Sequence, residues 1–288
     1  MPLTIAYPVI DPVLVNIGPF PIRWYALAYI VGLILGWAYC RYLVARDDLW
    51  GGVLRPSVAS IDDLLIYMAL GVILGGRLGY VLFYNPDHYF AHPEEMVAVW
   101  KGGMSFHGGL AGSVLAIYLF ARRQKVGFAS VLDIAAAAVP IGLFLGRIAN
   151  FIKPELWGRP CPLPCDVPWA MVFPDAGPLP RHPSQLYEAG LEGIILFLIL
   201  FAAVRAGALR RPGLAAGLFA IGYGLARIIS EFFRQPDPQL GYLFGSNWLT
   251  MGMMLSLPVI AAGLALLRFA YRQPAKAKPQ GPQSAGPT

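Results

Sequence analysis

The chain has 288 residues, of which 57% are hydrophobic and only 13% are charged. Soluble domains carry about 25% charged residues, so this composition excludes an ordinary soluble protein and is typical of an integral membrane protein. The formal net charge is +6, but the basic residues flank apolar segments and form no groove-lining patch, which argues against a nucleic-acid-binding protein.

Apolar segments predict an all-α integral membrane protein, a bundle of about seven transmembrane helices. The segments hold about 16 to 24 residues each, near the roughly 20 that a helix needs to cross the hydrocarbon. In chain order they cover residues 21–43, 61–84, 107–120, 131–152, 186–204, 214–233 and 247–269. The first begins without a basic region before it, so we expect no cleavable signal peptide.

The loops between these segments predict the orientation. One set of loops, together with the C-terminal tail, contains 13 lysines and arginines, the other set contains 6, and the remaining 3 of the 22 lie inside spans. Because cytoplasmic loops are enriched in Lys and Arg, the first set is expected in the cytoplasm. We therefore expect the N-terminus outside and the C-terminus in the cytoplasm.

The chain is expected to form one polytopic domain over residues 1–272, followed by a disordered cytoplasmic tail, 273–288, rich in Pro, Gly, Ala and Lys. Residues 153–183 are too long and proline-rich for a simple connector and predict a small head outside the membrane, with a short strand between 169 and 173. Cys161 and Cys165 in this head can form a disulfide or stay as free thiols. No four suitably spaced ligands are found, so no metal site is predicted.

Three predicted spans each contain an arginine, namely Arg77, Arg147 and Arg227. An ionisable group deep in a bilayer costs about 3 kcal/mol or more, so such a residue commonly marks a functional site. Counting 1.5 Å per residue along each span places all three in the outer half of the membrane. Other polar residues are predicted at the same level: Tyr25, His107 and Glu188.

Helical spacing groups some of these residues. Arg147 shares a helix face with Asn150, and Arg227 shares one with Glu231, which can steer its guanidinium and partly neutralise it. Glu188 and Glu192 also share a face, and one of them could pair with Arg77 or Arg147. We expect fewer carboxylates than guanidiniums in this layer, which would leave the arginines available for an anion. Glycines that predict close helix packing are Gly75, Gly76, Gly79, Gly142 and Gly146.

The segment GRIANFIKPELWGR, residues 146–159, resembles the signature of bacterial prolipoprotein diacylglyceryl transferases. The resemblance continues in the family's order through IRWY (22–25), SFHGGL (105–110), HPSQLYE (182–188) and RIISEFFRQPD (227–237). Such an ordered set is far more specific than one motif. The chain departs from the family at Lys153-Pro154, where Asn-Gly is usual. We expect this departure to alter the exit of the helix.

The resemblance implies an enzyme of the bacterial cytoplasmic (inner) membrane with its site near the periplasmic leaflet. It would transfer the diacylglyceryl group of phosphatidylglycerol to the lipobox cysteine of a prolipoprotein, forming a thioether and releasing glycerol phosphate. This reaction is the first step of lipoprotein maturation. The implied partners are phosphatidylglycerol, the signal-peptide and lipobox segment of the prolipoprotein, and membrane lipid. Neither a cofactor nor a nucleic acid is implied.

The residues fit that chemistry. Arg147 and Arg227 are expected to bind and stabilise the phosphate through their planar guanidiniums, with Arg77 as a third candidate. His107 is the candidate base for the substrate thiol, although an arginine-rich field alone could also lower the pKa of that thiol. Asn150 and Tyr25 are expected to hold the head group. The supporting residues are Glu155, Gly158, Glu188 and Glu231.

The main alternative is a transporter of an anionic solute. A transporter would also place arginines in spans, but its site should lie near the midplane, between repeated halves. Here the charged layer is displaced outward and no repeat is found. A receptor would need a cytoplasmic coupling surface, and an intramembrane protease would need a nucleophile–base or aspartate pair. We find neither in the sequence.

Overall fold

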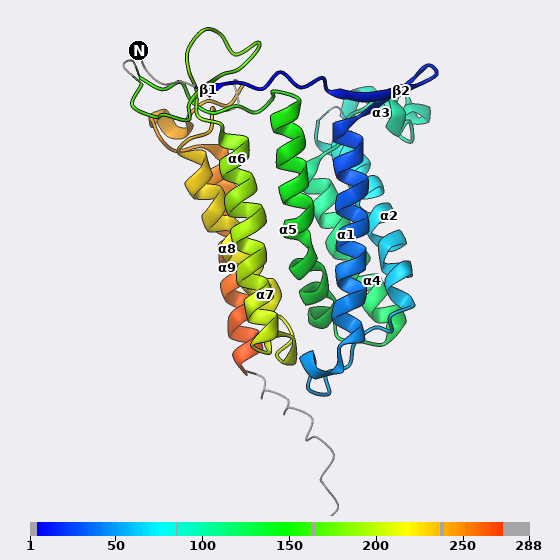
Figure 1. Ribbon diagram of the computed structural model, residues 1–288. Coiled ribbons are helices and arrows are strands. Elements are labelled where there is room, and N and C mark those ends of the chain that lie inside the picture. Colours follow the sequence, from blue (N-terminus) through cyan, green and yellow to red (C-terminus); the bar gives the residue numbers. More distant parts are fainter. Residues whose placement is uncertain (1–4, 85, 163–164, 237–238, 273–288) are drawn as a thin grey trace, which may run out of the picture.

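Long helices arranged side by side form the body of the protein (Figure 1). The computed structural model describes residues 5–84, 86–162, 165–236 and 239–272. Six long helices in these residues are α1 (Trp24–Ala45), α2 (Ser60–Phe83), α4 (Phe106–Gln124), α5 (Phe128–Ile152), α8 (Leu214–Glu231) and α9 (Met251–Arg272). A seventh long segment, between α5 and α8, is continuous but made of three parts: α6 (Ser184–Glu188), a π-helical turn (Ala189–Ile195) and α7 (Leu196–Arg205). The predicted tail, 273–288, lies outside the described residues.

Six of these segments are long and apolar enough to cross a membrane, and α4 is the exception. The prediction of a multi-pass membrane protein is therefore confirmed, while the count of about seven spans stays a prediction. Large apolar side chains stay exposed along the helices, as lipid contact requires; Leu74 and Leu78 of α2 are 63% and 59% exposed. The segment predicted at 107–120 is longer in the structure, because α4 continues to Gln124.

The low hydropathy of α4 has a packing reason, because its glycines lie against glycines of α2. A Cβ added at Gly71 would come within 2.6 Å of the Gly112 oxygen, and one at Gly79 within 2.8 Å of the Gly108 Cα. Gly75 also packs against Gly108 and Gly112, so the two backbones touch along several turns. The predicted role of Gly75 and Gly79 is confirmed.

The other predicted glycines differ from one another. A Cβ at Gly76 would meet Met104. A Cβ at Gly32 of α1 would lie 3.3 Å from the Gly142 Cα, so α1 approaches α5 closely there, although no atom lies within 4 Å of a Cβ built at Gly142 itself. No atom lies within 4 Å of a Cβ built at Gly146 either, and no neighbour approaches its Cα in this way, so the prediction of close helix contact at Gly146 is wrong.

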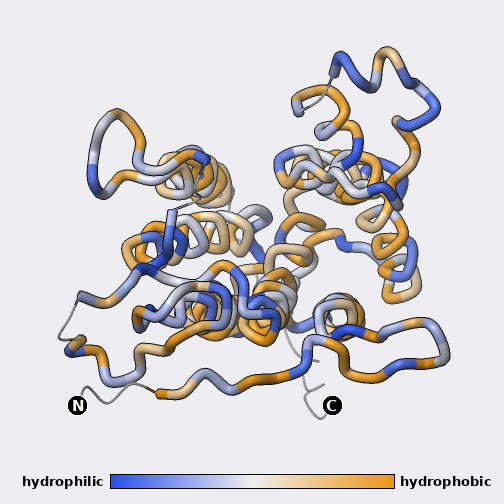
Figure 2. The backbone as a smooth tube through the Cα atoms, turned by 90° about the horizontal axis from the view of Figure 1, so that it is seen from above, coloured by the Kyte–Doolittle hydropathy of each residue, from blue (hydrophilic) through white to orange (hydrophobic). Residues whose placement is uncertain are grey.

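Two small sheets lie at one end of the bundle, so the fold is mostly helical rather than all-α. Strand β1 (Ile5–Ala6) pairs in parallel with β4 (Met171–Val172), which confirms the short strand expected between 169 and 173. Strand β2 (Val13–Ile17) pairs antiparallel with β3 (Phe20–Arg23). The N-terminal segment with β1 and β2 runs across this end (Figure 1) and along one edge of the bundle (Figure 2).

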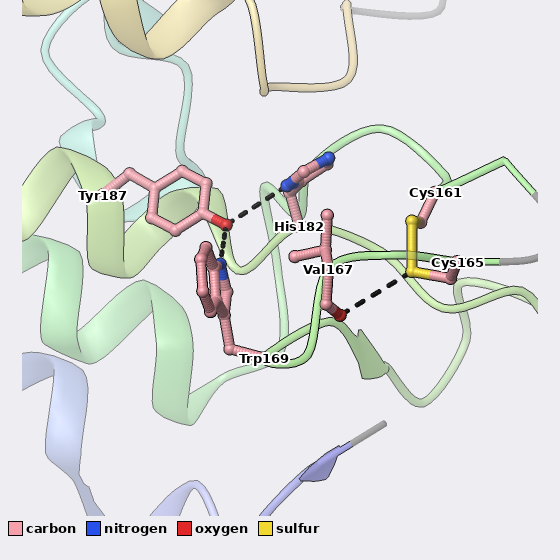
Figure 3. The surroundings of a disulfide bond; sticks show 6 residues. All are labelled: Cys161, Cys165, Val167, Trp169, His182 and Tyr187. Carbon is pink, nitrogen blue, oxygen red and sulfur yellow. Dashed lines mark hydrogen bonds between the residues drawn. A yellow bond between two sulfur atoms is a disulfide. The ribbon is translucent and has the colours of Figure 1, made fainter. Parts of the chain in front are cut away.

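Residues 153–183, called the head segment below, lie at the same end. Backbone bridges join Gly158 to Arg234, and Pro160 and Met171 to Arg181. Cys161 and Cys165 form a disulfide, close to a cluster in which Trp169 Nε1 donates to the Tyr187 hydroxyl (Figure 3). The described parts of the head segment are thus joined to one another and, through Gly158, to the residues that follow α8.

The opposite end of the bundle, which we call the tail end, is closely packed. Leu43, Trp50, Phe120, Ile134 and Leu209 are fully buried there. Asp133, also fully buried, accepts hydrogen bonds of 2.7 Å from the Gly213 and Ala216 amides and so caps the start of α8. Open space between α1, α2 and α5 nevertheless reaches this core, because Cys40 and Ile61 line the same cavity as Tyr25.

Candidate functional site

Two of the three predicted arginines meet near the head segment. Arg147 of α5 and Arg227 of α8 are bridged by Glu188, whose Oε2 lies 2.8 Å from Arg147 Nε and whose Oε1 lies 3.4 Å from Arg227 Nη1. Glu192 forms a second bridge, with Oε2 3.2 Å from Arg147 Nη2 and Oε1 3.9 Å from Arg227 Nη1. Both carboxylates are buried, where an unpaired negative charge would be strongly destabilising. The contacts with the two guanidiniums compensate for that burial.

Glu231 extends this cluster on the α8 side. Its Oε1 lies 2.6 Å from Arg227 Nη2, which confirms the predicted i, i+4 pair, and its Oε2 accepts a 2.6 Å hydrogen bond from Thr250 Oγ1. Arg234 Nη1 lies 3.9 Å from Glu231 Oε1. Arg234 had no predicted role, yet it is only 9% exposed.

The balance of charge in the cluster differs from the prediction. Three carboxylates, Glu188, Glu192 and Glu231, lie among three guanidiniums, those of Arg147, Arg227 and Arg234. The expectation of fewer carboxylates than guanidiniums is therefore wrong. The physical reason is the cost of burial, because an unpaired charge in this setting is far more costly than a paired one.

Two cavities meet at Arg147. The first, of about 700 Å³, lies between α4, α8 and α9, and its polar lining includes His107, Arg147, Tyr223 and Arg227. The second, of about 670 Å³, lies between α1, α2 and α5. Its polar lining includes Tyr25, Arg147 and Asn150, and the rest is largely apolar. One guanidinium thus borders both spaces.

His107 lies in the first turn of α4, where Ser105 caps the helix by accepting a 3.2 Å hydrogen bond from the Gly108 amide. The His107 side chain is exposed, and it lines the first cavity together with Arg147 and Arg227. His107 therefore borders the same space as the two guanidiniums.

Asn150 and Glu155 form a pair at the exit of α5. Asn150 Nδ2 donates to Glu155 Oε1 at 2.8 Å, and Lys153 Nζ lies 2.6 Å from Glu155 Oε2. The Lys153 ammonium also lies 5.8 Å from the ring centre of Tyr25, within range of a cation–π contact. Lys153, where the chain departs from the family pattern, therefore binds both neighbours, and α5 still continues to Ile152.

Gly158 and Arg159 attach the head segment to the end of α8. The Gly158 amide donates to the His182 carbonyl at 3.0 Å, and a Cβ at this position would come within 2.7 Å of the Phe233 oxygen. Arg159 donates to the carbonyls of Arg234 and Glu231 at 2.9 and 2.8 Å. Glycine at 158 therefore allows a backbone contact that a larger residue would block.

Arg77 lies outside this cluster, and its expected role as a third phosphate ligand is not carried into the proposal below. Its guanidinium donates to four backbone carbonyls, those of Glu95, Met96, Gly102 and Gly103, and stacks 5.0 Å from the centre of the Tyr89 ring. The side chain is only 4% exposed. Backbone carbonyls between α2 and α4 thus accept hydrogen bonds from the guanidinium that was expected to bind an anion.

Sequence reasoning missed two residues of the site. Tyr223 lines the first cavity, and Thr250 binds Glu231. The expected pairing of Glu188 or Glu192 with Arg147 is found for both glutamates. Tyr223 is four residues before Arg227, so helical spacing could have found it. Thr250 directly precedes α9, and no sequence motif or helical spacing connects it to Glu231. Only folding brings it next to α8.

The chain is similar to known proteins over almost its whole length. The family model described as "Prolipoprotein diacylglyceryl transferase" matches residues 12–269. A relative from Methylocella silvestris is 68% identical, over 96% of this chain and 99% of its own length, and is named "Phosphatidylglycerol--prolipoprotein diacylglyceryl transferase". Relatives of the same name from Beijerinckia indica and Rhodopseudomonas palustris are 67% and 59% identical, over 93% and 96% of this chain and 96% of each relative.

Proposed function

Because the chain belongs to the prolipoprotein diacylglyceryl transferase family, we propose that it transfers the diacylglyceryl group of phosphatidylglycerol to the lipobox cysteine of a prolipoprotein. The products are a thioether-linked lipoprotein precursor and glycerol phosphate. The observation that carries the proposal is the position of Arg147, which borders both a largely apolar cavity and a cavity that contains His107 and Arg227.

The second cavity suits a phospholipid. Its lining from α1, α2 and α5 is mostly apolar, with Gly32, Met68 and Gly146 among its residues, while Tyr25, Arg147 and Asn150 provide polar groups near the head segment. Acyl chains would lie against the apolar part, and the phosphate would lie at Arg147. Tyr25 and Asn150 would hold the glycerol of the head group by hydrogen bonds.

Arg147 has a nitrogen available for the phosphate. Within the described residues its Nε and Nη2 contact Glu188 and Glu192, and no hydrogen bond is found for Nη1. Arg227 uses Nη1 and Nη2 for its glutamates. A phosphate oxygen can accept from Arg147 without displacing either carboxylate, which would account for a site that is both neutral and able to bind an anion.

The proposed step is a displacement at the glyceryl carbon that bears the phosphate. The cysteine sulfur forms a bond to this carbon while the carbon–oxygen bond breaks, and the electron pair leaves with the phosphate. The guanidiniums of Arg147 and Arg227 stabilise the charge that grows on the leaving oxygen. The thiol proton passes to His107 or, if the arginine field alone favours the thiolate, directly to the departing phosphate.

The proposed setting is the bacterial cytoplasmic (inner) membrane, with the head segment on the periplasmic side and the N-terminus outside. Two observations support this orientation. Arg147 lies five residues before the end of α5 at Ile152, which is about 8 Å from the head end of the helix. The basic side chains Arg122, Arg123, Arg205 and Arg210 lie on the tail-end loops or helix ends, as expected for a cytoplasmic face.

Family membership does not favour the alternative of an anion transporter. A direct test uses the purified protein in vesicles of phosphatidylglycerol with a peptide that carries a lipobox cysteine. We expect the mass of the peptide to increase by one diacylglyceryl group on the cysteine, and a cysteine-to-serine peptide to stay unchanged. An unmodified cysteine peptide, with the protein folded and the lipid present, would refute the proposed function.

A further inference from the structure

A turn of π-helix interrupts the segment that carries the two bridging glutamates. It covers Ala189–Ile195, directly after α6, and continues into α7. Turns of this kind are rare, and they occur frequently at functional sites, because they change the direction in which nearby side chains point. This turn contains Glu192 and begins one residue after Glu188.

Gly193 brings the π-helical turn against α5. A Cβ added at Gly193 would come within 2.6 Å of the Phe144 Cβ and 2.9 Å of the Phe144 Cα. Phe144 is three residues before Arg147, so this contact fixes the turn beside the base of the Arg147 side chain. The neighbouring Glu192 is thereby placed at the guanidinium.

Glu192 contacts one particular edge of that guanidinium. Its Oε2 lies 3.3 Å from Arg147 Nε and 3.2 Å from Arg147 Nη2. Its Oε1 lies 3.9 Å from Arg227 Nη1, and no hydrogen bond to this oxygen is found among the described residues. The side chain is completely buried.

Glu192 balances one of the three guanidinium charges, but charge balance does not decide at which edge of Arg147 its carboxylate lies. Glu188 already pairs with both arginines, and Glu231 pairs with Arg227. A buried carboxylate loses the free energy of its hydration. When one of its oxygens lacks a hydrogen bond, as Glu192 Oε1 does among the described residues, the protein replaces only part of that free energy. Burial of the Glu192 carboxylate therefore has a cost in stability that its contacts offset only in part. At the Nε edge of Arg147, its two hydrogen bonds fix the plane of the guanidinium.

We propose that Glu192 is a positioning residue, which, with the π-helical turn and Gly193, fixes the Arg147 guanidinium so that Nη1 is presented to the phosphate of the lipid. The inference rests on the proposed function, since it concerns the same transfer reaction. It predicts that the position of the carboxylate matters as well as its charge. Glutamine would keep the shape and remove the charge, while aspartate would keep the charge and withdraw it by one methylene.

The test compares Glu192→Gln and Glu192→Asp with the wild-type protein in phosphatidylglycerol nanodiscs and a lipobox peptide. The measured quantities are kcat, KM for phosphatidylglycerol and the folded fraction, from size-exclusion chromatography and thermal unfolding. We expect kcat per folded protein to fall more than fivefold in both variants, while KM stays within threefold of the wild-type value. Lipid binding is retained because Arg147 and Arg227 are still present.

The matched control is Asp133→Asn, which changes another fully buried carboxylate, at the tail end of α5. It should reduce thermal stability and leave kcat per folded protein unchanged. The proposal is overturned if either Glu192 variant keeps kcat within fivefold of wild type, or if KM rises more than threefold. If Glu192→Gln does not fold, Glu192→Asp decides alone. A wild-type protein that transfers nothing refutes the proposed function itself, which distinguishes the two failures.

Discussion

Arg147 is the residue on which the site depends most, because it borders both cavities and pairs with two glutamates from another helix. We expect Arg147→Lys to lower kcat/KM at least tenfold, since an ammonium is a point charge and cannot bind two carboxylates and a phosphate from fixed directions. Peptide lipidation measured by mass spectrometry checks this. Arg122→Lys, on an exposed side chain at the end of α4, is the control that should keep full activity. Full activity of Arg147→Lys would show that the fixed directions of the guanidinium nitrogens are not required.

His107 is the second test at the level of the residue. If it accepts the thiol proton, His107→Gln should lower kcat by about 10²-fold or more, in line with the usual contribution of a general base. The loss should be smaller at high pH, where the thiol ionises without help. Rates measured between pH 7 and pH 9 decide the matter. A variant that transfers at nearly the wild-type rate would leave the arginine field as the only source of activation.

The sequence predicted individual residues well where helical spacing decides the neighbours. Arg227 with Glu231 and Arg147 near Asn150 follow from spacing of three or four residues, and both pairs are found on shared helix segments. Arg77 could not be predicted in this way, because its partners are backbone carbonyls of the connection between α2 and α4, 18 to 26 residues away in sequence. Nothing in residue type distinguishes an arginine that binds carbonyls from one that binds an anion.

At the level of elements, the contact between α2 and α4 depends on glycine. Gly75→Ala would place a methyl group against the backbone of Gly108 and Gly112, so the two helices would have to separate. We expect a loss of roughly 1–3 kcal/mol of stability, as for other overpacked positions. Thermal unfolding in detergent provides the measurement. Gly36→Ala is the control, since its nearest neighbour is an ordinary 3.9 Å away and stability should hardly change.

A second test at this level concerns the head segment and pH. Burial, and then the nearby Arg159 guanidinium, lower the pKa of His182 below its usual 6.5. The folded state therefore favours the neutral ring, which is positioned to accept from the Tyr187 hydroxyl through Nδ1 at 3.1 Å. Its contribution to stability is present above pH 6.5 and is lost as the pH falls through the lowered pKa, because the unfolded chain binds the proton first.

We accordingly expect the unfolding temperature to decrease between pH 7.5 and pH 5, and His182→Gln to reduce this decrease. His92→Gln, on an exposed histidine, is the comparison that should keep the wild-type pH dependence. Equal slopes for all three proteins would show that the His182 cluster does not titrate with folding.

At the level of the whole molecule, the sequence predicted a helical, multi-pass membrane protein, but it did not predict the packing that brings the site together. Periodicity and length give the helices, whereas the meeting of α6, α5 and α8 depends on contacts such as Gly193 with Phe144. The π-helical turn is likewise invisible to a hydropathy pattern, which treats 186–204 as one regular segment. The disulfide needed geometry, because the spacing of Cys161 and Cys165 allowed either state.

The disulfide gives a prediction at this scale. The ring it closes is short, so the entropy of the unfolded chain accounts for about 2 kcal/mol of stabilisation. Reduction should therefore lower the unfolding temperature, and a protein with both Cys161→Ser and Cys165→Ser should be insensitive to reductant. Differential scanning fluorimetry with and without dithiothreitol measures both effects. If reductant does not change the unfolding temperature of the wild-type protein, the disulfide does not contribute to the stability of the whole molecule.

Gly146 directly precedes Arg147, and no atom lies within 4 Å of the place where its side chain would begin. Open space therefore lies beside the backbone just before the guanidinium, on the wall that α5 contributes to the second cavity. Gly32, Gly36 and Gly142 line the same cavity. A fatty-acyl tail with a bend or a branch near its ester needs more width than a straight one, so these four glycines would bear on which lipids such a protein can consume.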